Sequence, residues 1–414
     1  MTALSEEELV ALLSELVARE TVNPPGNEEA LAEFLVERLD ASPVAFDVER
    51  QEVLPDRPNV AARAGDPVEG SVLLTGHLDV VPATPGDWSG DPFTLQREGD
   101  RLIGRGVADM KGALAAKLIA AEAFLSEFDR TGEVVLAFTV DEEVGNAGTK
   151  ALVEHGVDVD AAIIGEPTRL QVATAEYGAV GYSVTVHGES GHSGRPDRAV
   201  NAIDGLRRVL DRVEALDDEV QAQEHALLEP GPTVNITQVE GGSAPNVVPG
   251  EASATIDWRT LPSDREPGEF DERFAAFVED ATLNGECVAV SFDRGFFSSG
   301  FETDPDARIV QATLGAARDA GIEPARTGFN AGSDARFLTH AGIPTVLFGP
   351  GSVADDAHAV DESIQVDALL KTAETYRGVL ERALHCENCL SMWWQRCRYC
   401  NRRDSLQWPQ QRNY

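Results

Sequence analysis

The sequence predicts an α/β fold in which helices flank a mixed, mostly parallel sheet and a smaller α+β domain is inserted into the chain. The first observation is a set of apolar runs at 71–75, 133–140 and 161–164, whose lack of alternation is typical of strands buried on both faces. The second is that helical patterns separate such runs. The third is a change near residue 176, after which apolar and polar residues alternate as in a half-buried strand.

The N-terminal part predicts helices and strands in the order of an α/β domain. Residues 3–19 place Leu9, Leu12 and Leu16 on one helical stripe behind Ser5, a suitable N-cap. The other predicted elements are a turn at 21–27, a helix at 28–39, strands at 44–54 and 59–64, the strand at 71–75, a long loop at 82–100 and a helix at 113–128.

The segment that begins near residue 176 predicts a separate domain. Its elements are a strand at 182–186, a helix at 198–215, strands at 233–239 and 252–258, a helix at 266–281 and a strand at 287–292. This β-α-β-β-α-β order is that of the split βαβ, or ferredoxin-like, sandwich. A helix at 304–320, a strand at 344–348 and a helix at 367–384 then resume the first pattern. We therefore expect a main domain at 1–175 and 295–384, an inserted domain at 176–294 and a tail at 385–414.

The composition is that of a globular protein with an acidic surface. The 414 residues include 71 Asp and Glu against 34 Lys and Arg, a formal charge of -37. The acidic residues are spread along the chain, as in proteins adapted to high salt, and their field argues against nucleic-acid binding by the main body. No segment approaches the ~20 apolar residues of a membrane span. Cys287 is the only cysteine before residue 386, which favours a reducing compartment, the cytoplasm.

Polar residues with metal-ligand chemistry follow the apolar runs. His77 and Asp79 come directly after the strand at 71–75, where an open α/β sheet binds its ligands. The imidazole can bind a cation through one ring nitrogen while the Asp79 carboxylate accepts the N–H of the other. Taken alone, such a pair is also typical of a solvated turn.

Later in the chain, carboxylates and a second histidine also lie beside predicted buried strands or at the start of a helix. These carboxylates also have ordinary alternatives, which are helix capping for Asp109 and a solvated loop for residues 141–143. Because the carboxyl ends of parallel strands share one edge of a sheet, the whole set should converge there as ligands for two divalent metal ions, with one carboxylate bridging. The set comprises His77, Asp109, Glu142, Glu143, Glu166 and His358.

These residues and their neighbours resemble a known family, the co-catalytic metallopeptidases and deacylases that include acetylornithine deacetylase, succinyl-diaminopimelate desuccinylase, aminoacylase and glutamate carboxypeptidase. The resemblance covers about residues 4–384 and implies a zinc-peptidase-like catalytic domain with an inserted dimerisation or lid domain. The matching motifs are TGHLDVVP, GRGVADMKG, TVDEEVG, IIGEPT, GHSGRP with NAI, NVVPGEASATIDWR, GSDARFL, and FGPG with AHAVDE.

The resemblance implies two zinc ions and assigns their ligands. His77 and Glu166 would bind one ion, Glu143 and His358 the other, and Asp109 would bridge both. Cobalt and manganese also suit these ligands.

The resemblance also implies roles for the residues around the ligands. Asp79 is similar to the family's orienter of the first histidine, and Glu142 to the general base, which takes a proton from the metal-bridging water and passes it to the leaving amine. The family has a cis peptide after its bridging aspartate, so we expect the Asp109–Met110 bond to be cis.

Three residues of the inserted domain match family positions near the substrate. His192 is similar to a histidine that reaches the partner subunit's active site and stabilises the oxyanion, although its Gly- and Ser-rich neighbours are also typical of a solvated turn. Arg259, with Asn246 nearby, lies where relatives hold a substrate carboxylate, and a surface acid is the alternative partner for Arg259. Since the insertion carries dimerisation in many relatives, the resemblance implies a homodimer.

The activity implied is hydrolysis of the amide bond of an N-acyl amino acid, of the acetylornithine deacetylase or succinyl-diaminopimelate desuccinylase type. Glu166, rather than an aspartate, is similar to that branch. A metallo-carboxypeptidase or dipeptidase of the same family is the alternative enzyme. A zinc-dependent interaction module carried by the tail is the non-enzymatic alternative.

The tail after His385 differs in composition from the rest of the chain. Cys386, Cys389, Cys397 and Cys400 form two C-x2-C pairs with the spacing of zinc ligands, so a small zinc knuckle is one interpretation. A disordered or non-native extension is the other.

The charge balance predicts that the fold requires salt. At low ionic strength the like charges repel one another across a longer distance, which disfavours the compact state. We expect the melting temperature to fall as salt is lowered from molar to millimolar concentration, measured by circular dichroism. Equal melting temperatures at both extremes would contradict the expectation.

Overall fold

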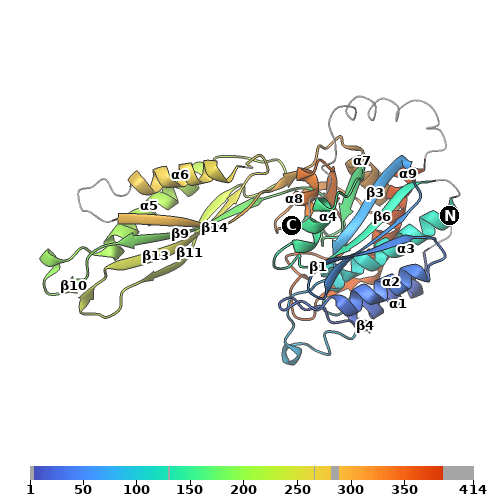
Figure 1. Ribbon diagram of the computed structural model, residues 1–414, viewed down its shortest axis with the longest axis horizontal. Coiled ribbons are helices and arrows are strands. Elements are labelled where there is room, and N and C mark those ends of the chain that lie inside the picture. The colour runs from blue at the N-terminus through green and yellow to red at the C-terminus, as the bar shows by residue number, and fades with distance from the viewer. Residues whose placement is uncertain (1–3, 129–130, 265, 281–288, 386–414) are drawn as a thin grey trace, which may run out of the picture.

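The computed structural model describes residues 4–128, 131–264, 266–280 and 289–385, which form two lobes (Figure 1). The larger lobe is an α/β layer structure. The second, elongated lobe is formed by the chain between β8 (Val172–Glu176) and β15 (Phe301–Glu302). Cys287 and the four cysteines of the tail lie outside the described residues.

The larger lobe is built on a nine-stranded sheet with the strand order β1-β2-β6-β3-β7-β17-β8-β15, and β16 pairs with β8. The central pairs β6–β3, β3–β7 and β7–β17 are parallel, while β1–β2, β2–β6 and β8–β15 are antiparallel. The predicted α/β class with a mixed, mostly parallel sheet is confirmed. The bounds are β1 (Asp47–Leu54), β2 (Arg57–Ala64), β3 (Asp66–His77), β6 (Gly132–Thr139), β7 (Ala161–Ile164), β16 (Arg326–Phe329) and β17 (Thr345–Leu347).

Helices cover both faces of this sheet. The chain passes from β3 through α3 (Gly112–Glu127) to β6, and from β6 through α4 (Ala147–Glu154) back across β3 to β7. Because parallel crossovers are right-handed, two crossovers in opposite directions place α3 and α4 on opposite faces. The other helices are α1 (Glu6–Val17), α2 (Glu29–Asp40), α7 (Arg308–Asp319), α8 (Ala335–His340) and α9 (Val366–Leu384), and no helix of the described ranges is long and apolar enough to cross a membrane.

Burial explains the apolar runs of the central strands. β6 is buried at every position, and β3 is buried from Gly70 to His77. Leu73, Leu136 and Ile163 are fully buried within a core formed between the sheet and its helices. A strand covered on both faces needs apolar side chains on both, so its sequence does not alternate.

The structure also contains short elements that the sequence pattern did not predict. The predicted loop at 82–100 includes η1 (Pro85–Asp87) and β4 (Gln96–Glu98), and β4 pairs with β5 (Arg101–Ile103), which pairs with β18 (Ser363–Gln365). β8, β16 and α8 were not predicted either. Segments of three to six residues are too short for a periodic pattern to identify them.

The elongated lobe follows the predicted β-α-β-β-α-β order. Its antiparallel sheet has the order β11-β13-β9-β14, and its buried side chains, including Tyr182, Ile256 and Phe274, form a core of their own. The Tyr182 and Phe274 rings stack with centroids 4.2 Å apart. The domain limits near 176 and 294 stay a prediction. The elements are β9 (Gly178–His187), β10 (Gly191–His192), η3 (Pro196–Arg198), α5 (Ala202–Val220), β11 (Thr233–Gly241), β12 (Val247–Val248), β13 (Glu251–Thr260), α6 (Pro267–Asp280) and β14 (Ala289–Ser298).

Candidate metal centre

The candidate ligands lie at one edge of the large sheet. His77 is the last residue of β3, and Glu143 follows β6, which pairs with β3 in parallel so that His77 stands opposite Thr139. Glu166 follows β7, the parallel neighbour of β3 on its other side. Asp109 lies in the turn η2 (Val107–Lys111) that leads into α3, and His358 lies in the loop between β17 and β18. Parallel pairing thus brings together residues up to 281 positions apart, from 77 to 358.

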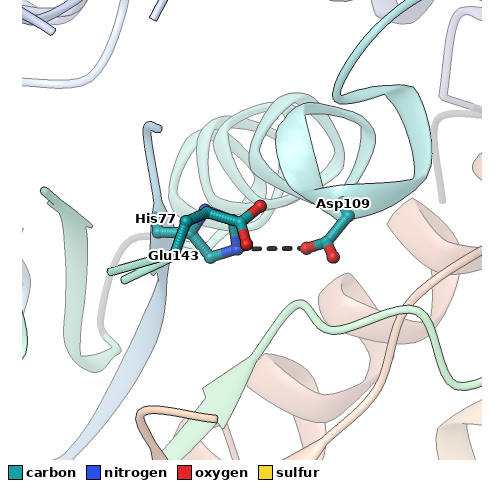
Figure 2. Close-up of side chains that lie close together, drawn as sticks. All are labelled: His77, Asp109 and Glu143. Atoms are coloured by element: carbon teal, nitrogen blue, oxygen red, sulfur yellow. Dashed lines mark hydrogen bonds and ion pairs between the residues drawn. The ribbon is translucent and has the colours of Figure 1, made fainter. Parts of the chain in front are cut away.

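Asp109 stands between the two histidines, each facing a different carboxylate oxygen. His77 Nε2 lies 3.0 Å from Asp109 Oδ1, and His358 Nε2 lies 3.4 Å from Asp109 Oδ2. His358 Nε2 is also 3.1 Å from an oxygen of Glu143. Figure 2 shows His77, Asp109 and Glu143 gathered together, and their candidate ligand atoms all lie within 4.8 Å of one another. The Asp109–Met110 bond is cis, as the resemblance implied.

Glu166 has a buried oxygen without a hydrogen-bond partner among the described residues. Its side chain is buried, and Oε1 has no hydrogen-bond partner in the part of the chain that the structure describes. A buried carboxylate oxygen without a donor is unfavourable unless a cation binds it. Together with two imidazoles and the two oxygens of Asp109, this oxygen fits a pair of divalent metal ions.

The side chains of the centre compensate one another's charge. Burial raises the pKa of Glu166 well above its usual value, and the neighbouring Asp109 raises it further. Burial also raises the pKa of Glu142, helped by nearby carboxylates such as Glu143. Hydrogen bonds to Asp109 and Glu143 raise the pKa of His358 to about 10. The raised pKa values of the two glutamates share one cause, which is burial among other carboxylates, and metal cations would relieve this crowding of negative charge.

The orientation of His77 differs from the prediction. Its Nδ1 lies 2.9 Å from the backbone carbonyl oxygen of Asp79 and 3.7 Å from the Asp79 carboxylate, so the carbonyl accepts the Nδ1–H. Nε2 is thereby left for a cation. The Asp79 carboxylate instead accepts the backbone N–H groups of Glu142 and Glu143, each at 3.1 Å. Asp79 thus holds the main chain that carries the predicted base and one predicted ligand.

Glu362 plays the same part for Asp109, and the sequence prediction missed it. Its buried carboxylate accepts the backbone N–H groups of Gly106, Ala108 and Asp109 at 2.8–3.0 Å. The Arg105 guanidinium donates to it at 2.7 Å. The available signal was its place in the AHAVDE motif, four residues after His358.

The GSDARFL motif supplies a second buried polar cluster beside the centre. Ser333 donates its backbone N–H to Glu176 at 3.0 Å and its hydroxyl to the other carboxylate oxygen. Arg336 lies 3.6 Å from Glu176 and donates to Asn146 at 2.8 Å. Asn146 in turn donates to the backbone carbonyl of Glu142 at 3.0 Å. This cluster connects α8 to the loop that carries the predicted base.

Two of the three predicted residues of the inserted domain lie far from the centre within one chain. His192 and Asn246 are exposed and lie at or beside the β10–β12 pair, at the end of the elongated lobe far from the large sheet (Figure 1). Arg259 is exposed and pairs with Asp257 at 2.8 Å, which is the alternative of a surface acid.

An α/β sheet edge that gathers imidazoles and carboxylates in this way is the donor set of a site for divalent metal ions. Residues 73–382 match the family model described as peptidase family M20/M25/M40, and the chain belongs to this family. It is 34% identical over 396 residues to an acetylornithine deacetylase of Myxococcus xanthus, covering 91% of this chain and 96% of that protein. An acetylornithine deacetylase of Klebsiella pneumoniae is 33% identical, covering 81% of this chain and 87% of that protein.

Solved structures share the fold. Aminopeptidase PepT from Bacillus cereus superimposes with a TM-score of 0.77 at 21% identity, covering 92% of this chain and 99% of that one. Human carnosine dipeptidase 1 superimposes with a TM-score of 0.67 at 21% identity, covering 91% and 96%. The predicted family and fold class are confirmed, and the chain is a metallohydrolase.

The buried Glu176 generates a prediction on stability. Burial raises its pKa to about 8, against the opposing effect of Arg336, so between pH 4.5 and 8 the folded protein holds a proton that the unfolded chain releases. Its contribution to stability is present below pH 4.5 and is lost as the pH rises through 8. Glu176→Gln removes this loss, so its free energy of unfolding relative to the parent should increase by on the order of 4 kcal/mol from pH 5 to pH 9. Urea titrations across that range measure it, and parallel pH curves for the two proteins would contradict it.

Proposed function

We propose that the chain hydrolyses the amide bond of an N-acyl amino acid, as an acetylornithine deacetylase or a succinyl-diaminopimelate desuccinylase would. The observation that carries the hydrolytic assignment is Asp109, whose two oxygens face His77 and His358 separately while Glu142 lies beside Glu143. The substrate class is supported by relatives named acetylornithine deacetylase that align with most of the chain.

The proposed ligand assignment keeps the pairs implied by the family resemblance. His77 and Glu166 would hold one divalent ion, Glu143 and His358 the other, and Asp109 both. The contacts of His358 with Glu143 and Asp109 support the second group, and the unpartnered oxygen of Glu166 supports the first. We take zinc as the ion, with cobalt and manganese as alternatives. When bound, the two ions would lower the pKa of water and polarise the substrate carbonyl.

Glu142 is the proposed general base. Its carboxylate would take a proton from the attacking water and deliver it to the nitrogen of the leaving amine. A raised pKa suits both tasks, because a base that binds its proton weakly cannot hold it until the C–N bond breaks. Asp79 acts through the main chain, since it holds the N–H groups of residues 142 and 143.

The inserted domain is proposed to act between subunits. In a homodimer, His192 from a second copy of the chain would stabilise the oxyanion, and Arg259 and Asn246 would bind the substrate carboxylate. The distance of β10 from the large sheet of its own chain agrees with a role across a subunit interface. We further propose a cytoplasmic, salt-adapted enzyme, because of its acidic charge and the single cysteine before residue 386.

If Glu142 is the base, Glu142→Ala should abolish measurable turnover. General base catalysis contributes about 10²–10⁴-fold to kcat, so the loss should be at least of that order, while the metal content stays unchanged. Metal analysis of the purified variant alongside kinetics measures both. Glu143→Ala is the matched control, because loss of a ligand should lower the metal content as well. If Glu142→Ala retains activity, the base has been assigned wrongly.

The substrate class is tested by a panel of N-acetylornithine, N-succinyl-diaminopimelate and dipeptides. We expect kcat/KM to be highest for one of the two acylated amino acids. Higher values for the dipeptides would favour the alternative, a metallo-carboxypeptidase or dipeptidase. Absence of hydrolysis of every compound would contradict both substrate classes. The non-enzymatic alternative rested on the tail, which lies outside the described residues, and it does not agree with the membership of the chain in a hydrolase family.

A further inference from the structure

A segment near the N-terminus lies directly beside the start of the metal centre. Thr21 donates its hydroxyl to the backbone carbonyl of Leu78 at 2.6 Å. Asn23 donates its backbone N–H to the carbonyl of Val80 at 2.9 Å, and Val80 donates to Thr21 at the same distance. The predicted turn at 21–27 is therefore anchored to the residues that immediately follow His77.

The side chain of Asn23 joins two buried carboxylates. Its Nδ2 donates to Asp79 Oδ2 at 2.9 Å and to Asp141 Oδ1 at 3.0 Å. Both neighbours are carboxylate oxygens, which only accept when ionised, so the amide nitrogen and not its oxygen must face them. The amide has two N–H groups, one for each carboxylate. Asn23 itself is 3% exposed, so water does not substitute for these contacts.

Asp79 and Asp141 hold the turn at residues 141–145, which carries Glu142 and Glu143 and is called the corner below. Asp79 accepts the backbone N–H of both residues. Asp141 precedes them with a φ of 67°, in the left-handed region, and its backbone carbonyl accepts the N–H of Gly145 at 3.0 Å. Asn23 therefore donates to both of the carboxylates that hold this corner.

A buried ion pair supports Asp141 at the same oxygen that accepts from Asn23. Arg57 Nη1 lies 3.1 Å from Asp141 Oδ1, and the same guanidinium binds both oxygens of Glu28 at 2.6 and 2.7 Å. Gly26 makes room for it, because a Cβ there would lie 2.2 Å from the guanidinium carbon of Arg57. The NPPGN sequence therefore provides both the amide and the space for its supporting arginine.

We propose that Asn23 is a positioning residue that sets the location of Glu142 and Glu143 through Asp79 and Asp141. This inference rests on the proposed function, in which Glu142 is the base and Glu143 a metal ligand. Without the two N–H groups, Asp79 and Asp141 would lose the side chain that donates to both, Arg57 would remain on Asp141 alone, and the corner would shift. A shift of about 1 Å in a reacting group is enough to lower a rate by about 10²-fold.

The test compares Asn23→Asp, which keeps the shape but replaces the NH2 group by an oxygen, with Asn23→Ser, which supplies one hydroxyl donor on a shorter side chain. In the full chain we expect kcat to fall by about 10²-fold for Asn23→Asp and less for Asn23→Ser, with KM within about twofold of the parent. The second measurement is the visible absorption spectrum of the cobalt-loaded proteins, which reports the ligand field. Displacement of Glu143 should change the spectrum of Asn23→Asp.

Leu13→Ala is the control for a purely structural effect. Leu13 is fully buried in α1, outside residues 141–145, so its truncation lowers the melting temperature through lost packing. Its kcat and cobalt spectrum should match the parent. Asn23 variants that fold, with unchanged kcat and an unchanged cobalt spectrum, would overturn the proposal, as would variants that lose stability only, as Leu13→Ala does.

Failure of the proposed function gives a different result. If Glu142→Ala remains active, kcat no longer reports on the corner, but the cobalt spectrum still reports the position of Glu143. A changed spectrum for Asn23→Asp would then support the positioning role in spite of the wrong base, and an unchanged one would refute it.

Discussion

The parallel pairing of β3 with β6 on one side and β7 on the other is the constraint on which the metal centre depends. Each strand ends at the same edge, so the residues after it must share that space. His77, Glu143 and Glu166 arrive there from three separate stretches of the chain, and the cis turn at Asp109 supplies the residue between them. A shift of one residue in the register of β3 would turn His77 toward the opposite face of the sheet and separate it from Asp109 and Glu143.

The carboxylates of this centre fall into two groups, candidate metal ligands and residues that bind the backbone N–H groups behind them. One oxygen of the buried Glu166 carboxylate has no hydrogen-bond partner in the described part of the chain, as expected of a group that would bind a cation. Asp79 and Glu362 lie behind the candidate ligands with their oxygens committed to backbone N–H groups. The main chain that carries the candidate ligands is therefore held by contacts that do not depend on a bound ion, which is the preorganisation that catalytic sites require.

Much of the fold and of the candidate site could be predicted from the sequence, because both leave local marks. Unbroken apolar runs indicate buried strands, and a histidine or carboxylate at the end of such a run indicates a ligand. The role of Asp79 was less accessible, since spacing does not distinguish its carbonyl from its carboxylate as the partner of His77. Glu362 and Asn23 act on residues far away in the chain, so the contacts they make cannot be inferred from their sequence neighbours, even though Glu362 lies in the AHAVDE motif. The same holds for β8 and β16, which are ordered by their neighbours more than by their own sequence.

The elongated lobe leaves and rejoins the large sheet at one point. β8 leads into β9 through Tyr177 alone, and β15 pairs with the end of β8, where Phe301 stands opposite Glu176. An insertion whose two ends meet leaves the hydrogen-bond ladder of its host uninterrupted. The elongated lobe can therefore change in length and surface during evolution without disturbing the edge that carries the candidate ligands. One catalytic lobe could in this way serve different substrates.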